Sequence, residues 1–335
     1  MKYIPLYPVW LWYCIKARSL WFFTPSNPAL TFGGFEGESK MEMYAQLPPG
    51  SYPKTVLIQH EEPFVSVMEK LTKADLSFPI AVKPDVGMMG FLFRQIETVR
   101  DLQQYHETMP VDYIVQTLVT YPIEVSVFYY RMPDEQSGTI TGFIRKEYLQ
   151  VTGDGTSTLE DLIKNYSRVR FRQDEMRAKH ISRLHEVLPA GQIYYLSLAL
   201  NLSRGGKMVS LEHEKDSKLL SLFDKLSHHS GKLYYGRYDI KCASIADLKE
   251  GKNFSILEFN GSGAEPHHVY GNGNNIFQAY SVFLHHWKML YRISRYNNSS
   301  GIKYWSFMRG YRFLKEAKKH FRMLKQLDNE MPVFQ

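Results

Sequence analysis

The feature that most constrains the fold is a pair of strand-like segments, each carrying an acidic residue among apolar and aromatic ones. The first is YYGRYDIK at residues 234–241, and the second is FSILEFN at residues 254–260. Polar, turn-forming residues separate them, so two neighbouring antiparallel strands are predicted. Glu258 and Asn260 lie two positions apart and therefore share one face of their strand. We expect both to meet the carboxylate of Asp239 on that face.

Oxygen ligands of this kind favour a hard cation. Carboxylate and amide oxygens without His or Cys suit Mg²⁺, which usually shares its coordination shell with substrate phosphates. Mn²⁺ is left open as the alternative metal. The segment therefore indicates a magnesium-nucleotide site, although two ordinary hairpin strands with one solvated acid each would show the same local pattern.

A second motif lies upstream, in FPIAVKPDVGMMG at residues 78–90. An apolar strand ends in Lys83, and the loop after it contains Gly87 and Gly90. A lysine at a strand end and glycine N–H groups are suited to a nucleotide triphosphate. The loop is not a Walker loop, because no Gly-Lys-Ser or Gly-Lys-Thr follows. An ordinary turn between strands is the alternative.

The ordered set of motifs resembles the ATP-grasp superfamily of carboxylate-amine ligases. The order is Lys-Pro with a glycine loop, then Glu124 in a second strand, then Arg-x-Asp and Glu-x-Asn. D-alanine:D-alanine ligase and the ATP-grasp part of cyanophycin synthetase show the same order, and the resemblance covers about residues 39–270. It implies an α+β fold in which two lobes grip ATP between antiparallel sheets, with ATP and Mg²⁺ required for activity.

The resemblance also implies roles for individual residues. Arg237 would be the catalytic residue that stabilises the acylphosphate and the tetrahedral intermediate, and the metal ligands would be Asp239, Glu258 and Asn260. The lysines and glycines of the ATP site would hold the phosphates, and Glu124 would bind the ribose hydroxyls. The backbone of the predicted strand at residues 113–119 would hold the adenine. The complete ATP-binding set is Lys40, Lys83, Gly87, Gly90, Gln116, Thr117, Val119, Glu124 and Lys146.

Some of these assignments keep an alternative. Lys40, in a predicted helix that begins with a capping box at Ser39, is in a position more often occupied by a solvated lysine. Arg145 and Lys146 face opposite sides of a predicted strand, so only one of them points into the ATP site.

The substrate end departs most from the family pattern. Residues 261–268, GSGAEPHH, replace an Asn-x-x-Pro-Gly run, and their glycines could present N–H groups to an oxyanion. The candidate substrate contacts are Arg204, Gly263, Glu265 and His267. A solvated loop arginine is the plainer interpretation of Arg204.

Composition and charge exclude several classes of protein. With 44% hydrophobic and 22% charged residues, the 335-residue chain is not a mainly disordered one. Its two cysteines favour a reducing, cytoplasmic location over a disulfide scaffold. Of the net charge of +7, residues from Phe277 onward supply +8, with eleven basic and three acidic side chains, so the rest is close to neutral. This distribution does not favour a nucleic-acid enzyme.

Three regions are predicted along the chain. Residues 1–38 form an aromatic-rich segment in place of the fuller domain that precedes the ATP-grasp domain in the family. Residues 39–275 form the ATP-grasp domain, with a nucleotide-binding lobe at about 75–120 and a second lobe at about 121–275. Residues 276–335 form a basic helical extension, whose last helix has the apolar face Tyr311, Leu314, Phe321 and Leu324.

We expect an enzyme that joins a small-molecule carboxylate to an amine, of the amino-acid or peptide class, through an acylphosphate. Two alternatives stay open. One is a catalytically silent ATP-grasp module with a regulatory role. The other is a membrane-surface protein, in which the aromatic residues 3–23, too short and polar to span a bilayer, and the basic last helix make the contact. A homodimer also stays open, because dimers are common in the superfamily.

Overall fold

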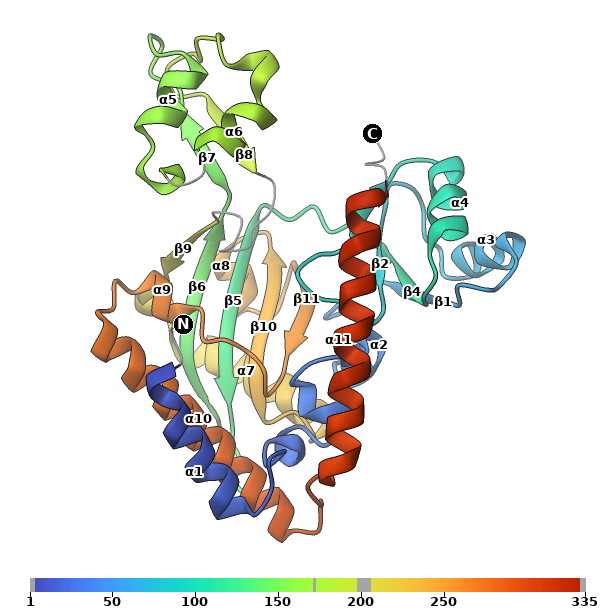
Figure 1. Ribbon diagram of the computed structural model, residues 1–335, viewed down its shortest axis with the longest axis vertical. Coiled ribbons are helices and arrows are strands. Elements are labelled where there is room, and N and C mark those ends of the chain that lie inside the picture. The colour runs from blue at the N-terminus through green and yellow to red at the C-terminus, as the bar shows by residue number, and fades with distance from the viewer. Residues whose placement is uncertain (1–3, 171–172, 198–205, 332–335) are drawn as a thin grey trace.

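The described residues form two main antiparallel sheets with helices on their outer faces, and a third sheet of two antiparallel strands (Figure 1). The structure is a computed structural model that describes residues 4–170, 173–197 and 206–331. The expected α+β class, with antiparallel sheets and a helical C-terminal region, is confirmed. None of the helices in these described ranges combines the length and apolar character needed to cross a bilayer.

The larger sheet has five antiparallel strands. Alternation along these strands turns the apolar side chains to one face, where Tyr238, Phe259 and Phe143 pack against helices α7 and α8. The strand order is β11 (Phe254–Asn260), β10 (Tyr235–Cys242), β5 (Ile123–Tyr130), β6 (Thr139–Glu147) and β9 (Lys207–Ser210). The covering helices are α7 (Ser217–Ser230) and α8 (Ile245–Lys249), and the turn η7 (Glu212–Glu214) precedes α7.

The smaller sheet has four strands and its own core. Val67 and Leu71 from α3, with Leu102 and Tyr105 from α4, pack on one of its faces. The strand order is β1 (Thr55–Ile58), β4 (Tyr113–Thr117), β2 (Ile80–Pro84) and β3 (Arg94–Ile96). The helices are α3 (Phe64–Lys73) and α4 (Val99–Thr108).

A small excursion extends from the larger sheet and has a separate core (Figure 1). Here Thr158 caps the helix α5, in a capping box with Asp161. The elements are β7 (Leu149–Thr152), α5 (Leu159–Asn165), η4 (Ser167–Val169), α6 (Gln173–Lys179), η5 (Ile181–Arg183) and β8 (Ile193–Ser197).

The N-terminal segment packs on the body of the protein. Trp10 and Tyr13 of α1 contact Trp287 and Tyr291 of α10. Pro8 does not break α1, because proline is tolerated in the first helical turn. The elements from this end of the chain are η1 (Ile4–Leu6), α1 (Tyr7–Ala17), η2 (Thr24–Ser26), η3 (Thr31–Gly34) and α2 (Lys40–Tyr44). Late in the chain follow α9 (His268–Gly271) and α10 (Ile276–Ser299).

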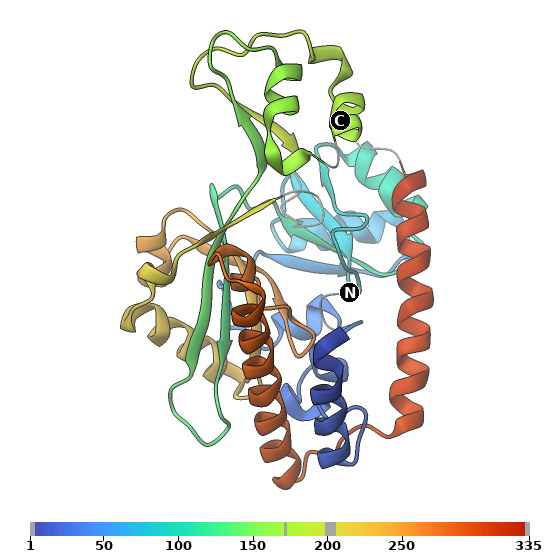
Figure 2. The same ribbon diagram turned by 60° about the vertical axis from the view of Figure 1, so that its left-hand side comes forward.

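Helix α11 (Phe307–Glu330) joins the two halves of the molecule. It runs along the protein from the end of α10 to the smaller sheet (Figure 2). Phe313 and Leu314 pack with the aromatic cluster around α1 and α10, whereas Phe321 and Leu324 belong to the core of the smaller sheet. The predicted apolar face is therefore confirmed except at Tyr311, which is 52% exposed.

Truncation of Leu324 tests the contribution of α11. Leu324 has no exposed surface, so Leu324→Ala should lower the free energy of unfolding by about 3 kcal/mol. Lys325→Ala, at an exposed position on the same turn, should change it by less than about 0.5 kcal/mol. Urea unfolding followed by circular dichroism measures both. Equal effects of the two substitutions would show that α11 does not stabilise the smaller sheet.

Two neutral histidines lie between α10 and the larger sheet. The rings of His268 and His286 have centroids 5.5 Å apart, and both are buried. Gly142 of β6 makes room for the first, because a Cβ there would lie 2.0 Å from His268 Nδ1. Burial lowers the pKa of His268 to about 4, with Glu212 opposing and Lys215 and His285 adding to the effect. Burial also lowers the pKa of His286 well below its usual value.

These histidines predict a loss of stability in mild acid. A folded-state pKa below the unfolded value means that stability is fully present above about pH 6.5 and is lost as the pH falls toward 4. For His268 alone the loss between pH 7 and pH 5 is about 2 kcal/mol. Thermal melts should show a smaller fall of the midpoint in His268→Gln than in the wild type. The control His213→Gln removes a histidine that is 74% exposed and should keep the wild-type profile. An unchanged profile in His268→Gln would contradict the assignment.

Candidate functional site

The second face of the larger sheet carries the polar residues singled out by the sequence. Asp239 lies opposite Glu258 on one side and Ser126 on the other. Two positions before Asp239 on β10, Arg237 lies opposite Asn260 of β11. Two positions before Ser126 on β5, Glu124 lies opposite Lys146 of β6. Residues directly opposite one another in antiparallel strands share a face. The predicted convergence of Asp239, Glu258 and Asn260 is thus present in the sheet.

Asp239 is the most heavily bonded carboxylate of this face and is only 6% exposed. Arg237 grips it with two nitrogens, Nε at 3.1 Å from Oδ1 and Nη2 at 3.0 Å from Oδ2. Lys146 Nζ lies 3.1 Å from Oδ1, Asn260 Nδ2 donates to Oδ2 at 3.3 Å, and Ser126 Oγ donates to Oδ1. Although burial opposes it, the charges of Arg237 and Lys146 hold the pKa of Asp239 far below its usual range.

Lys146 points into this site, and Arg145 points away. Besides Asp239, the ammonium of Lys146 contacts Glu124 Oε1 at 3.1 Å. Burial lowers the pKa of Lys146, but the two carboxylates outweigh that effect and raise it above the usual value. Arg145 pairs instead with Glu147 at 2.5 Å. The expectation that only one of the two neighbours faces the site is confirmed.

Two more lysines reach the site from the other half of the protein. Lys83, at the end of β2, donates to the carbonyl of Leu257 in β11 at 3.3 Å. Lys40, at the start of α2, donates to the carbonyls of Asp85 and Gly87, each at 3.3 Å. Burial lowers the pKa of both lysines, while the charge of Glu258 opposes that effect in each. Lys40 is therefore a buried residue of this cluster and not a solvated surface lysine.

These two ammonium groups lack a direct carboxylate partner. Within the described residues, neither makes an ion pair, and the side chain of Glu258 makes no hydrogen bond. A buried cation bonded only to neutral carbonyls keeps a large desolvation penalty. The site thus contains positive charge that a bound anion would stabilise.

The glycine loop has a fixed base and an exposed tip. His320 of α11 contacts the carbonyl of Val86 at 2.8 Å, and Asp328 of α11 accepts from the N–H of Leu92 at 2.9 Å. Between these anchors, Gly90 has a φ of 73° and open space around it. The loop predicted to hold phosphate is therefore attached at both ends to the C-terminal helix.

The predicted adenine-binding backbone is partly engaged already. Gln116 pairs with Thr55 and Ala81 in the sheet, and its side chain donates to Tyr44 Oη and Thr55 Oγ1. The Thr117 N–H donates to the carbonyl of Lys54. The Val119 carbonyl accepts from Lys241 Nζ at 3.1 Å.

The candidate substrate residues have different environments. Arg204 lies outside the described residues. The N–H of Gly263 donates to the carbonyl of Gly34 at 3.2 Å, and the neighbouring Ser262 and Ala264 N–H groups are also used. The Gly263 N–H is therefore not available to an oxyanion in this conformation, because the loop is hydrogen-bonded to the N-terminal segment.

Glu265 and His267 lie beside Arg237. The Glu265 carbonyl accepts from Arg237 Nη1 at 2.9 Å, and its carboxylate accepts from Tyr270 Oη. His267 Nε2 lies 3.1 Å from the same Arg237 nitrogen. Because arginine only donates, Nε2 is the acceptor and the proton of the neutral ring is on Nδ1. Burial and the charge of Arg237 hold the pKa of His267 well below its usual value.

The donor set fits a hard divalent cation on the Glu258 side. Glu258 offers a carboxylate that makes no hydrogen bond within the described residues, and Asn260 offers an amide oxygen, whereas both oxygens of Asp239 are bonded to protein donors. No cluster of three or more His, Cys, Asp or Glu suited to a metal occurs in the described part of the chain. Two carboxylates and an amide would therefore make up the set, and Asp239 would exchange a protein donor for the metal.

Three residues of the site were missed in the sequence. Ser126 and Lys241 lie two positions from Glu124 and Asp239, so strand alternation alone could have placed them on the same face. Glu38 is the third, and burial raises its pKa to about 7.

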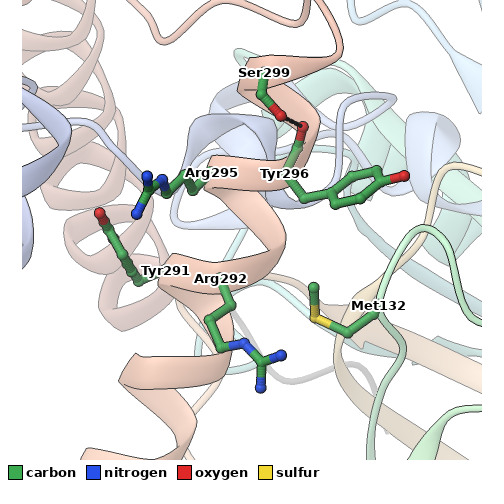
Figure 3. Close-up of a pocket in the computed structure, with 6 residues that line it drawn as sticks. All are labelled: Met132, Tyr291, Arg292, Arg295, Tyr296 and Ser299. Atoms are coloured by element: carbon green, nitrogen blue, oxygen red, sulfur yellow. Dashed lines mark hydrogen bonds between the residues drawn. The ribbon is translucent and has the colours of Figure 1, made fainter.

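A surface pocket elsewhere contains none of the predicted residues. It is lined by α10 and Met132, and its Arg292 and Arg295 extend in different directions (Figure 3).

No protein-family model and no curated protein sequence matches the chain. Solved structures do match it. They include a bifunctional glutathione synthetase from Pasteurella multocida, with 13% identity, a TM-score of 0.44 and coverage of 75% of this chain and 35% of that one. The VanG D-Ala:D-Ser ligase from Enterococcus faecalis has 14% identity, a TM-score of 0.41 and coverage of 82% and 64%. A D-alanine–D-alanine ligase from Bacillus anthracis has 12% identity, a TM-score of 0.43 and coverage of 78% and 69%.

The chain thus spans about a third of the matched synthetase and about two thirds of the matched ligases. All three TM-scores are below 0.5, and all three identities are below 15%.

Proposed function

We propose that the protein is an ATP-dependent ligase that joins a carboxylate to an amine through an acylphosphate. The observation that carries the proposal is a pair of lysines, the buried Lys40 and the half-buried Lys83, whose ammonium groups donate only to carbonyls within the described residues. They lie in one electrostatic cluster with Glu258. A polyphosphate is the anion that suits several fixed cations beside hard oxygen ligands.

The proposed roles divide between the two sheets. Lys40, Lys83 and the loop from Gly87 to Gly90 hold the phosphates of ATP. Glu124 binds the ribose, and the chain from Gln116 to Val119 lies along the adenine. Mg²⁺, held by Glu258, Asn260 and Asp239, would neutralise phosphate charge. The family resemblance supports these roles, and the contacts of the two lysines agree with them.

The reaction proposed has two balanced steps. A carboxylate oxygen attacks the γ-phosphorus of ATP, the bond to the β–γ bridging oxygen breaks, and ADP leaves. The amine nitrogen then attacks the acyl carbon, a proton is lost, and the C–O bond to phosphate breaks. Arg237 stabilises the charge on the acylphosphate and the tetrahedral intermediate, while Lys146 and Asp239 keep its guanidinium in place. Most of the acceleration comes from alignment and charge neutralisation.

Turnover with a substrate pool tests the proposal. Purified protein with Mg-ATP should release ADP and phosphate when amino acids and short peptides are supplied. The double variant Asp239→Asn plus Glu258→Gln should lose this release, because it removes two carboxylates of the metal set. If ATP binds but no pool stimulates release, the protein is a silent nucleotide-binding module. If ATP does not bind, the proposed site is wrong.

Substitution of Arg237 separates binding from chemistry. Arg237→Gln should lower kcat by about 10²- to 10³-fold, because one fixed charge is lost from the transition state, while the Kd for ATP changes little. Arg145→Gln is the matched control, because it removes an arginine of β6 that points to the opposite face of the same sheet. Steady-state kinetics and calorimetric titration with a non-hydrolysable ATP analogue give the two quantities. An equal loss in both variants would remove Arg237 from its proposed role.

A further inference from the structure

The helix α1 is apolar on both faces, although only one face is covered. Trp10, Tyr13 and Cys14 are packed on the aromatic cluster around α10. The outward side, which we call the α1 face, consists of Ile4, Tyr7, Leu11, Trp12 and Ile15, each between 54% and 68% exposed. Helices that are hydrophobic all round are normally buried on every side. An exposed apolar stripe of this kind marks an interaction surface.

The apolar surface continues from α1 to the start of α11. The indole Nε1 of Trp21 donates to the carbonyl of Phe307 at 3.1 Å, and the two rings stack with centroids 6.4 Å apart. Phe307, Met308 and Tyr311 are all more than half exposed. The beginning of α11 thus adjoins the end of the α1 segment, and α10 lies alongside α1 (Figure 2).

The charge around this surface is of one sign. Residues 4–35 and 266–315, which contain α1, α10 and the first part of α11, include no Asp or Glu. They contain nine basic residues, which gives them a formal charge of +9 and leaves the rest of the chain at −2. All nine are exposed, and they are Lys16, Arg18, Lys288, Arg292, Arg295, Lys303, Arg309, Arg312 and Lys315.

We propose that the α1 face, with the exposed start of α11, docks on the surface of a bilayer that contains anionic lipid. Trp and Tyr favour the interface between water and acyl chains, and Leu and Ile insert below it. The surrounding Lys and Arg side chains attract acidic headgroups, each strengthening binding about five-fold near such a surface. The charge pattern selects lipid over a second copy of the chain, because two surfaces with this many basic residues repel each other. This binding is independent of the proposed ligase activity.

Flotation with vesicles tests the proposal on the full-length protein. The wild type should float with phosphatidylcholine vesicles that contain phosphatidylglycerol, but not with pure phosphatidylcholine. Binding should weaken strongly in about 1 M salt, where the Debye length is about 3 Å. The triple variant Lys303→Gln, Arg312→Gln and Lys315→Gln should partition about a hundred-fold less. The matched control removes Lys73, Arg100 and Lys252, which are exposed on other parts of the surface, and should float as the wild type does.

The apolar part of the surface is tested separately. Leu11→Asn with Ile15→Asn should lower partitioning at least about ten-fold, whereas Val65→Asn with Ile181→Asn, at positions 69% and 72% exposed, should not. Circular dichroism and thermal melting show whether each variant is folded. Wild-type protein that stays unbound, or a Leu11 and Ile15 variant that floats fully, would overturn the proposal. A lipid-free dimer that this variant dissociates would also overturn it and would assign the face to a second copy.

Discussion

The arrangement of the larger sheet depends on charge compensation at Asp239. A carboxylate at this depth is stable only because Arg237 and Lys146 are bonded to it from its own strand and from β6. Those partners come together only in one register, in which Arg237, Asp239, Glu124 and Lys146 all lie on the face opposite the apolar core. A shift of a single residue would turn these charges into the cluster around Phe223 and Tyr238. The ionic network therefore specifies the pairing of strands as well as the chemistry.

The two halves of the molecule are coupled by a small number of polar contacts. Tyr44 Oη donates to the Leu257 carbonyl at 2.7 Å and accepts from Gln116 at 3.0 Å. Lys83 donates to the same carbonyl. Leu257 immediately precedes Glu258, so a strand of the larger sheet is held against β2 and β4 at the point where the proposed metal ligands begin. Helix α11 adds a second connection between the two halves. Its first part packs on the aromatic cluster around α1 and α10, and its second part packs in the core of the smaller sheet.

The sequence predicted the parts of the site that are governed by local periodicity. Strand alternation was sufficient for Asp239, Glu258 and Asn260. The antiparallel return after Gly138 placed Arg145 and Lys146 on opposite faces but did not decide which of the two points into the site. The state of Lys40 could not be predicted, because its burial depends on Asp85 and Gly87, which lie more than forty positions along the chain. The use of the Gly263 N–H was hidden for the same reason, since its acceptor is Gly34. Tyr311 is exposed because α11 packs on the aromatic cluster around α1 and α10 with its first part and on the smaller sheet with its second part. A single periodic apolar face does not describe such a helix.

The basic residues fall into two classes, and burial separates their physical roles. Lys40 and Arg237 are buried, and Lys83 and Lys146 are partly buried. Each therefore needs a specific partner in a fixed position, because a misplaced anion would not compensate for the lost hydration. The nine basic residues around α1 and α10 remain hydrated, and a single contact there contributes little because water and salt screen it. Only an extended anionic surface that meets many of them at once can use that charge. The net charge of +7 therefore combines two kinds of basic residue. The largely buried ones need a partner in a fixed position, whereas the exposed ones act only when many of them meet the same surface.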